Sequence, residues 1–250
     1  MSYKNKLEII SNLVVDLYNH LPKTNKIIYV DGGELTGTTS LVNGVENVFK
    51  NTFISYEPSR DTKKKIIDTY GNGCFVSPDS EVISGIIEIF MEDRKVNQMT
   101  DESRTMICDR GILSTVIYQS GILDMESTLD DVKINCDMIL KSAMRNEIKI
   151  PSIMVVLCFG DMNYLPMYME AFKRRLNARI DNKEQEIDEM DDVAMAMTIS
   201  RIYTDLCESV EYLLDNVLIH TIDFSLTKEE VVNEFTKIAT KWGKLETSKL

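Results

Sequence analysis

A glycine-rich segment, DGGELTGTTS at residues 31–40, has a composition and spacing suited to binding phosphate. Gly32, Gly37 and Thr39 match the pattern G-x-x-x-x-G-K-[ST] at every fixed position except the lysine, where Thr38 stands. Small residues let backbone N–H groups turn inward around a phosphate, and a following helix adds positive potential at its N-terminus. The alternative is an ordinary glycine-rich turn between a strand and a helix. The predicted phosphate-binding residues are Gly32, Gly33, Thr36, Gly37, Thr38, Thr39 and Ser40.

Polar residues also follow two further apolar runs that have the length of buried strands. The run 52–55 is followed by Tyr56 and Glu57, and the run 105–108 is followed by Asp109 and Arg110. Ligands of open parallel sheets bind outside the carboxyl ends of the strands, so these side chains are expected beside the glycine-rich loop. A carboxylate next to a guanidinium suits Mg²⁺–phosphate chemistry, and a local salt bridge is the alternative. Within the loop, Thr39 would place its hydroxyl on Mg²⁺.

Four segments, in order along the chain, resemble the thymidylate kinase family of nucleoside monophosphate kinases. They are VDGGELTGTTS (30–40), SYEPS (55–59), EIFMEDR (88–94) and MICDRGILSTVIYQS (106–120). The last is the most specific, since it is similar to the family's VxCDRYxxSxxAYQ pattern. The resemblance covers residues 26–240. It implies a P-loop kinase fold, ATP and Mg²⁺ as cofactors, a homodimer, and phosphoryl transfer to a deoxypyrimidine monophosphate, with dTMP as the first choice.

The resemblance also implies roles for individual residues. Asp109 would be the second Mg²⁺ ligand, holding the ion through water, or would accept the proton of the attacking phosphate, and Arg110 would clamp the acceptor phosphate. Phe90 would stack on the pyrimidine, and Arg94 would reach the base edge or the monophosphate. Taken alone, Phe90 is equally well a core aromatic and Arg94 a solvated helix end. The other residues implied in the acceptor pocket are Glu34, Glu57, Ser114, Tyr118 and Gln119.

The segment 173–192, KRRLNARIDNKEQEIDEMDD, lies where the family has its arginine-bearing lid. Arg174 and Arg179 are the predicted catalytic arginines of this lid, with Arg175 beside them. A cation delivered by a moving segment would supply the charge that Thr38 lacks. A solvated amphipathic helix is the alternative, and the acidic residues 184–192 are expected to form a solvated face.

Three positions depart from the family pattern. Thr38 replaces the phosphate-loop lysine, Gly111 replaces the aromatic residue after Asp-Arg, and Tyr56 replaces the arginine before Glu57. Each departure removes charge or bulk near the expected ligand. Two other functions therefore stay open: a kinase for another acceptor, such as a nucleoside or a modified base within DNA, or a nucleotide-binding protein without turnover.

Five apolar runs predict the strands that position these residues: Lys26–Val30, Thr52–Ser55, Thr105–Cys108, Ile153–Phe159 and Val217–Ile222. Between them, apolar residues recur at helical spacing, as in 41–49, 82–90, 129–143 and 231–242. Strands that alternate with helices predict a parallel sheet with right-handed crossovers. The expected fold is α/β, a three-layer P-loop kinase fold with a five-stranded parallel sheet flanked by helices.

Composition sets the remaining expectations for the 250 residues. A helical extension is expected over residues 1–24, where apolar residues recur at helical spacing: Leu7, Ile10, Leu13, Val14 and Leu17. One kinase-like domain is expected over 25–250, because no linker or repeat interrupts it. The net charge of −12 argues against a broad nucleic-acid surface. No apolar run approaches the roughly 20 residues of a membrane span. Five widely spaced cysteines without a CxxC motif predict free thiols in a reducing compartment, so a cytoplasmic protein is expected.

Overall fold

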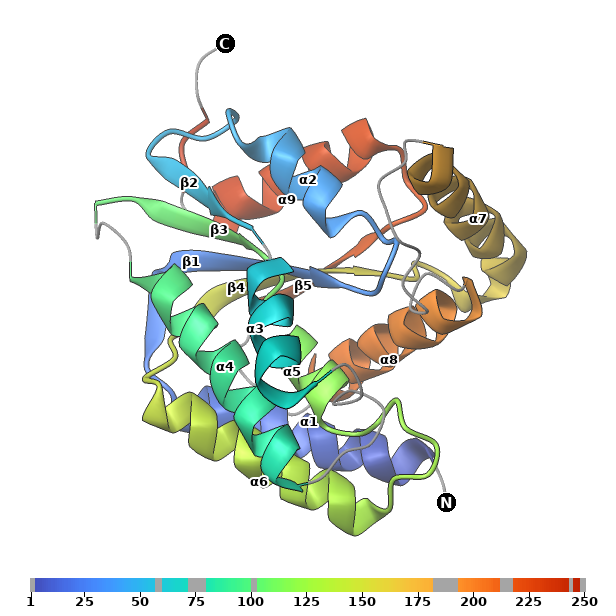
Figure 1. Cartoon of the computed structure of the whole chain (residues 1–250). Helices are drawn as coiled ribbons and strands as arrows, with labels where there is room; N and C mark the ends of the chain where they lie inside the picture. Colours follow the sequence, from blue (N-terminus) through green and yellow to red (C-terminus); the bar gives the residue numbers. More distant parts are fainter. Residues whose placement is uncertain are drawn as a thin grey trace.

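The computed structural model describes residues 3–56, 60–71, 80–99, 103–181, 193–211, 218–242 and 245–247. These residues are organised around one five-stranded sheet in the order β2–β3–β1–β4–β5, and all neighbouring strands are parallel (Figure 1). The strands are β1 (Lys23–Gly32), β2 (Thr52–Ser55), β3 (Thr105–Asp109), β4 (Ile150–Cys158) and β5 (Leu218–Asp223). Each predicted strand overlaps an observed one. The expected α/β fold with a five-stranded parallel sheet is therefore confirmed.

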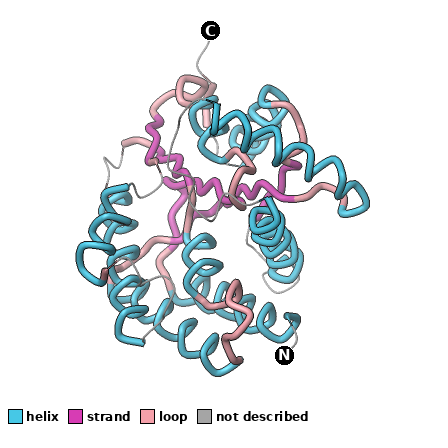
Figure 2. Tube along the Cα trace, turned by 45° about the vertical axis from the view of Figure 1, so that its right-hand side comes forward, coloured by secondary structure: helices cyan, strands magenta, loops and turns pink. Residues whose placement is uncertain are grey.

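Helices cover both faces of this sheet (Figure 2). The core on one face joins β1, β3 and β4 to α2 (Thr38–Val45), α7 (Leu165–Asp181) and α9 (Lys228–Trp242). The opposite core joins the sheet to α1 (Tyr3–His20), α4 (Ser80–Gln98), α5 (Ile112–Gln119), α6 (Leu129–Arg145) and α8 (Val193–Glu211). Two further elements are α3 (Arg60–Tyr70), which packs on α4, and the 3₁₀ turn η1 (Met162–Tyr164). The site-bearing strand ends thus lie between two helical layers.

Alternation along β1 assigns its side chains to the two cores. Ile28 and Val30 face the α2 side, and Tyr29 faces the α5 side. This is the period of two that a strand imposes on its side chains. Each side chain of β1 therefore contacts only one of the two helical layers.

Helix α1 packs against α6 and α8 and buries the apolar stripe that its sequence predicts. Because β1 itself begins at Lys23, α1 leads directly into the central strand of the sheet. The division of the chain at residue 24 into an extension and a domain stays a prediction.

Four of the cysteines, Cys108, Cys136, Cys158 and Cys207, are buried and not disulfide-bonded. Cys74 lies outside the described residues. Within the described ranges, no helix combines the length and the apolar character needed to cross a bilayer.

His220 on β5 gives the fold a predictable pH dependence. Its Nε2 is buried without a hydrogen-bond partner in the part of the chain that is described, and its ring lies 5.7 Å from that of Trp242. Burial, together with the charge of Lys241, lowers the pKa of His220 below 6.5. As the pH falls, the unfolded chain therefore takes up a proton at His220 more readily than the folded chain does. The contribution of the neutral imidazole to the free energy of unfolding is complete above the unfolded pKa and is lost as the pH falls below it.

We expect the His220→Phe variant to lose less thermal stability than the unchanged protein between about pH 7 and pH 5, because the variant has no imidazole to protonate. Melting temperatures from circular dichroism across this range test the prediction. His20→Asn, which alters an exposed histidine, is the matched control and should keep the original slope. Equal slopes for all three proteins would contradict the assignment.

Candidate functional site

The glycine-rich loop connects the end of β1 to the first turn of α2. Gly37 caps the helix with a φ of 96°, a conformation that glycine adopts without steric penalty. Thr36 closes the turn, because its N–H and its hydroxyl both donate to the carbonyl of Gly33, at 3.4 and 2.8 Å. The first-turn amides of Thr38 and Thr39 are ones for which an α-helix offers no internal acceptor. The loop therefore presents the N-terminus of α2 at the carboxyl end of the central strand.

Asp109, the last residue of β3, lies against this loop. Thr39 Oγ1 donates to Asp109 Oδ2 at 2.6 Å. Asp109 is only 2% exposed, and its Oδ1 has no hydrogen-bond partner among the described residues. Burial raises the pKa of the Asp109 carboxyl, against the opposing effects of the Thr39 hydroxyl, the Arg110 guanidinium and the Thr38 hydroxyl.

These oxygens fit a hard divalent cation. A buried carboxylate oxygen without a partner, next to a threonine hydroxyl, belongs to the donor types that Mg²⁺ prefers. Across the described ranges, no group of three or more His, Cys, Asp or Glu side chains could hold a metal by itself. An ion bound between Thr39 and Asp109 would therefore need phosphate oxygens or waters as its remaining ligands.

Arg110 follows Asp109 and is held over the loop. Its backbone has a φ of 70°, which is unusual for a residue with a side chain. One guanidinium nitrogen donates to the Gly32 carbonyl and the other to Glu34 Oε1 at 3.1 Å. Tyr118 Oη from α5 donates to the same Glu34 oxygen at 2.9 Å. Three predicted site residues, Glu34, Arg110 and Tyr118, are thus brought together beside the glycine-rich loop.

Arg94 and Ser114 lie on the same side of the sheet. Arg94 from α4 is buried, and it donates to Thr115 Oγ1 at 2.9 Å and to the Arg110 carbonyl at 3.5 Å. Ser114 donates to Asp31 Oδ1, and its hydroxyl is 2.9 Å from Tyr203 Oη. Arg94 is therefore brought next to Arg110 at the end of β3.

Asp31 and Tyr203 are site residues that the sequence reasoning missed. Asp31 is fully buried at the end of β1, where it also accepts the N–H of Gly111 at 3.0 Å. Its place directly before the glycine-rich loop was a usable signal. Tyr203 comes from the middle of α8, and its sequence neighbourhood gives no comparable indication.

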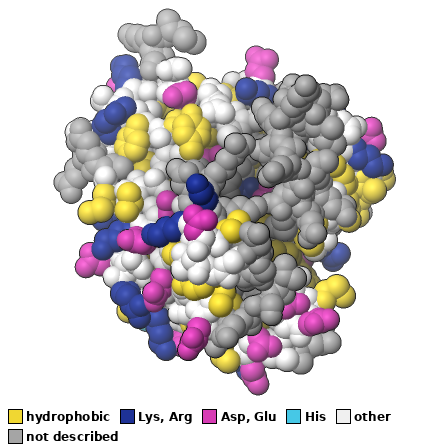
Figure 3. Space-filling model, viewed as in Figure 1, with side chains coloured by type: hydrophobic (Ala, Val, Ile, Leu, Met, Phe, Trp, Pro, Cys, Tyr) yellow, Lys and Arg dark blue, Asp and Glu magenta, His cyan; other side chains and the backbone are white. Residues whose placement is uncertain are grey.

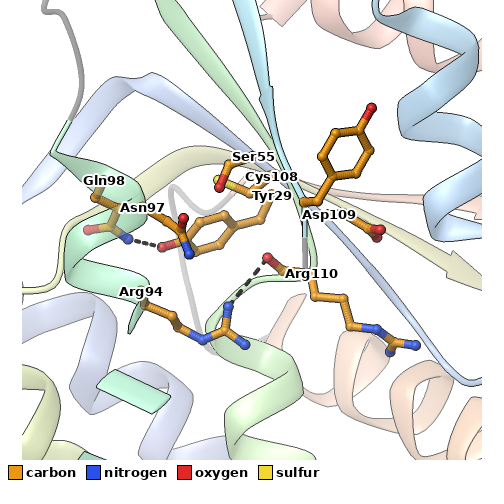
Figure 4. Close-up of a pocket in the computed structure, with 9 residues that line it drawn as sticks. Tyr29, Ser55, Arg94, Asn97, Gln98, Cys108, Asp109 and Arg110 are labelled. Carbon is orange, nitrogen blue, oxygen red and sulfur yellow. Dashed lines mark hydrogen bonds between the residues drawn. The ribbon is translucent and has the colours of Figure 1, made fainter. Parts of the chain in front are cut away.

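A narrow pocket opens between α4 and the carboxyl ends of β2 and β3 (Figure 4). Its cavity volume is about 10 Å³, the space of about one water molecule. Tyr56 at its edge is 47% exposed and donates to Asn43 Oδ1 at 2.9 Å. The lining residues are Tyr29, Ser55, Tyr56, Arg94, Asn97, Gln98, Cys108, Asp109 and Arg110. Side chains must move before this pocket can admit a nucleobase.

Arg175 on α7, in the segment predicted to form a lid, contacts the glycine-rich loop. Its two terminal nitrogens donate to the carbonyls of Leu35 and Phe224, each at 2.7 Å. Its Nη1 lies 3.8 Å from the point that a β-carbon on Gly37 would occupy. Burial and the neighbouring Arg174 lower the pKa of Arg175 to about 10, so the guanidinium stays charged at neutral pH. A fixed cation therefore sits beside the loop that lacks its lysine.

The other predicted lid arginines are not part of this contact as described. Arg174 is exposed on the outer side of α7, and the side chain of Arg179 lies outside the described residues. Residues 182–192, which include the acidic stretch, also lie outside them. The roles of Arg174 and Arg179 stay predictions.

Three further predicted residues are not seen to join the cluster. Phe90 is half-buried on α4 and packs against a small cluster formed by Ile66 and Ile86, so its ring does not line the pocket. Gln119 is half-buried at the end of α5, and Glu57 lies outside the described residues. The position of Phe90 agrees with a packing role.

No family model and no curated protein matches the sequence. Among solved structures, 51 chains match. One is a thymidylate kinase from Candida albicans, whose structure is titled as revealing the origin of its broad substrate specificity and a novel structural element. The match has a TM-score of 0.54 at 12% sequence identity and covers 90% of this chain and 98% of that one. This likeness shows that the chain shares the α/β fold of a nucleoside monophosphate kinase.

Proposed function

We propose that this protein is an ATP- and Mg²⁺-dependent kinase that phosphorylates a deoxypyrimidine monophosphate, with dTMP as the acceptor to be tested first. The observation that carries the proposal is the 2.6 Å hydrogen bond between Thr39 and Asp109. These residues are 70 positions apart in the sequence, yet they meet where the end of β3 lies against the start of α2. A hydroxyl and a carboxylate beside a phosphate loop form the metal–phosphate corner of P-loop phosphoryl transfer.

The proposed reaction assigns each basic group a task. Amides of the loop and of the first turn of α2 bind the phosphates of ATP, while Arg110 and Arg94 bind the phosphate of the acceptor. An acceptor oxygen attacks the γ-phosphorus, a new P–O bond forms, and the bond to the bridging oxygen breaks to release ADP. Mg²⁺ between Thr39 and Asp109 would neutralise charge on the triphosphate.

The missing lysine is offset in this proposal by Arg175. Thr38 is 4% exposed and neutral, so it cannot balance charge on the β- and γ-phosphates. Arg175 approaches the same loop from α7 and can exchange the carbonyls of Leu35 and Phe224 for phosphate oxygens. A charge-assisted bond to phosphate is stronger than one to a neutral carbonyl, which favours this exchange.

A nucleotide-binding protein without turnover is the second candidate. It is favoured by the narrow acceptor pocket and by the present pairing of Arg110 with Gly32 and Glu34. In that case ATP would bind at the loop, and no acceptor would reach the γ-phosphate.

A coupled assay for ADP formation separates these candidates. We expect ADP to form only when ATP, Mg²⁺ and dTMP are all present, and the product to be dTDP. Further reactions with thymidine, other monophosphates and modified-base DNA identify the acceptor class. ATP binding by calorimetry, without turnover for any acceptor, would reject the kinase and favour the second candidate.

The proposal includes a homodimer and a cytoplasmic location. Exposed apolar residues on α6, Ile134 at 54% and Met144 at 49%, offer surface for self-association. Light scattering coupled to size exclusion tests the dimer.

The buried cysteines without disulfide bonds suit a reducing compartment, which agrees with the proposed cytoplasmic location. Among the described side chains on the face drawn in Figure 3, acidic and basic groups are interspersed and form no extended basic patch that would favour nucleic acid.

A further inference from the structure

We infer that Tyr29, in the middle of β1, forms the wall of the acceptor pocket and restricts it to a small ring such as a pyrimidine. The inference rests on the proposed function, because it takes the acceptor to be a nucleoside monophosphate. Figure 4 shows the Tyr29 ring lying among Gln98, Arg94 and Arg110 in the pocket. Phe90, the aromatic residue that the sequence suggests for this pocket, packs elsewhere.

The Tyr29 ring is fixed at its outer end. Gln98 Nε2 donates to Tyr29 Oη, and Tyr29 Oη donates to the Lys149 carbonyl at 3.3 Å. Gln98 Oε1 in turn accepts the N–H of Lys149 at 2.9 Å. Burial raises the pKa of Tyr29, so the hydroxyl stays a neutral donor. The ring cannot swing out of the pocket without breaking these bonds, so it is a rigid wall.

Gly111 is the steric counterpart of Tyr29. A β-carbon at residue 111 would lie 2.3 Å from Tyr29 Cδ2 and 2.6 Å from Asp31 Oδ2. The φ of Gly111, −130°, suits any residue, so the need for glycine is one of space and not of backbone conformation. The Tyr29 ring, on the neighbouring strand β1, therefore occupies the space that a side chain at residue 111 would need.

The size of the pocket follows from this arrangement. With the phenol ring in place, the cavity measures about 10 Å³, and polar groups of Ser55, Asn97 and Gln98 line it. A ligand ring that enters must fit against a fixed wall, which penalises a purine more than a pyrimidine. Removing the ring from residue 29 opens the space that a second fused ring needs.

Calorimetric titration with dTMP and with dGMP, each with Mg²⁺ and ADP present, tests this directly. The unchanged protein should favour dTMP, Tyr29→Phe should keep that preference, and Tyr29→Val should shift the affinity ratio toward dGMP by about tenfold or more. An unchanged ratio in Tyr29→Val, or no binding of either nucleotide, overturns the inference. Tight, selective binding without turnover would reject only the proposed kinase activity.

Thermal unfolding tests the Tyr29–Gly111 contact without any ligand. Gly111→Ala should lower the melting temperature by about 5 °C or more in the unchanged protein, and by clearly less when combined with Tyr29→Ala, which removes the Cγ and Cδ2 atoms that the new β-carbon meets at 2.4 and 2.3 Å. Gly44→Ala is the matched control, since its β-carbon would meet Val232 on α9 at 2.7 Å. Its effect should be the same with and without Tyr29→Ala. Additive effects of Gly111→Ala and Tyr29→Ala would overturn the coupling.

Discussion

Replacing Arg175 with alanine is expected to lower kcat for phosphoryl transfer by about a thousandfold or more, the effect typical of an arginine that stabilises transferring phosphate. The reason is electrostatic. Thr38 leaves the loop without its lysine, and Arg175 is held beside Gly37 by the carbonyls of Leu35 and Phe224. Steady-state kinetics with saturating ATP and acceptor measure the loss.

Lys173→Ala is the matched control, because Lys173 is an exposed cation on the same helix that has no predicted role in the site. It should change kcat by less than about threefold, in line with an exposed charge. Adding Thr38→Lys to Arg175→Ala should restore part of the rate, since a cation returns to the loop. If Arg175→Ala kept full activity and an unchanged melting temperature, Arg175 would have no role in the proposed phosphoryl transfer. Thr38→Lys alone, raising the rate greatly, would show that Arg175 does not replace the lysine.

Asp109→Asn is expected to lower kcat by about a hundredfold or more and to raise the Mg²⁺ concentration needed for half-maximal rate. The substitution keeps the shape of the side chain but removes the charge that faces the ion. In metal-free protein the same variant should melt at a higher temperature, because burial already disfavours the Asp109 carboxylate. Opposite effects on activity and stability identify a residue retained for function.

Asp161→Asn provides the control for that experiment. Asp161 also follows a strand of the sheet, β4, but it is exposed and accepts the N–H of Asn163 at 2.9 Å. Its replacement should leave the Mg²⁺ dependence unchanged. If Asp109→Asn kept both the rate and the Mg²⁺ dependence, Asp109 would have no place in the proposed reaction.

The sheet could be predicted from the sequence because its central strands β1, β3 and β4 are buried on both faces over most of their length and therefore form continuous apolar runs in the sequence. The strand ends were less accurate, since hydrogen bonding and not hydrophobicity sets them. The run Lys26–Val30 predicted only the centre of β1, which extends over Lys23–Gly32 through polar residues that pair with β4. The position of the loop was predicted correctly because its glycine-rich motif marks it independently of the strand boundary.

The site could be predicted only where it lies at strand ends. Arg175 was not singled out, because adjacent arginines on a helix differ only in the face they occupy. Its position does carry a signal: Tyr168, Phe172 and Arg175 recur at i, i+4 and i+7, and the two aromatic residues are fully buried. Tyr29 was not predicted as a pocket residue for a different reason. Inside a strand, an aromatic side chain looks like core until its neighbours are known.

The most direct test of the account is a crystal structure with Mg²⁺ and a non-hydrolysable ATP analogue. We expect the β-phosphate to lie in the loop of residues 32–39, the metal to lie between Thr39 and Asp109, and the Arg175 guanidinium to contact a phosphate oxygen. A triphosphate bound elsewhere, or a loop whose amides face away from it at saturating nucleotide, would contradict the account.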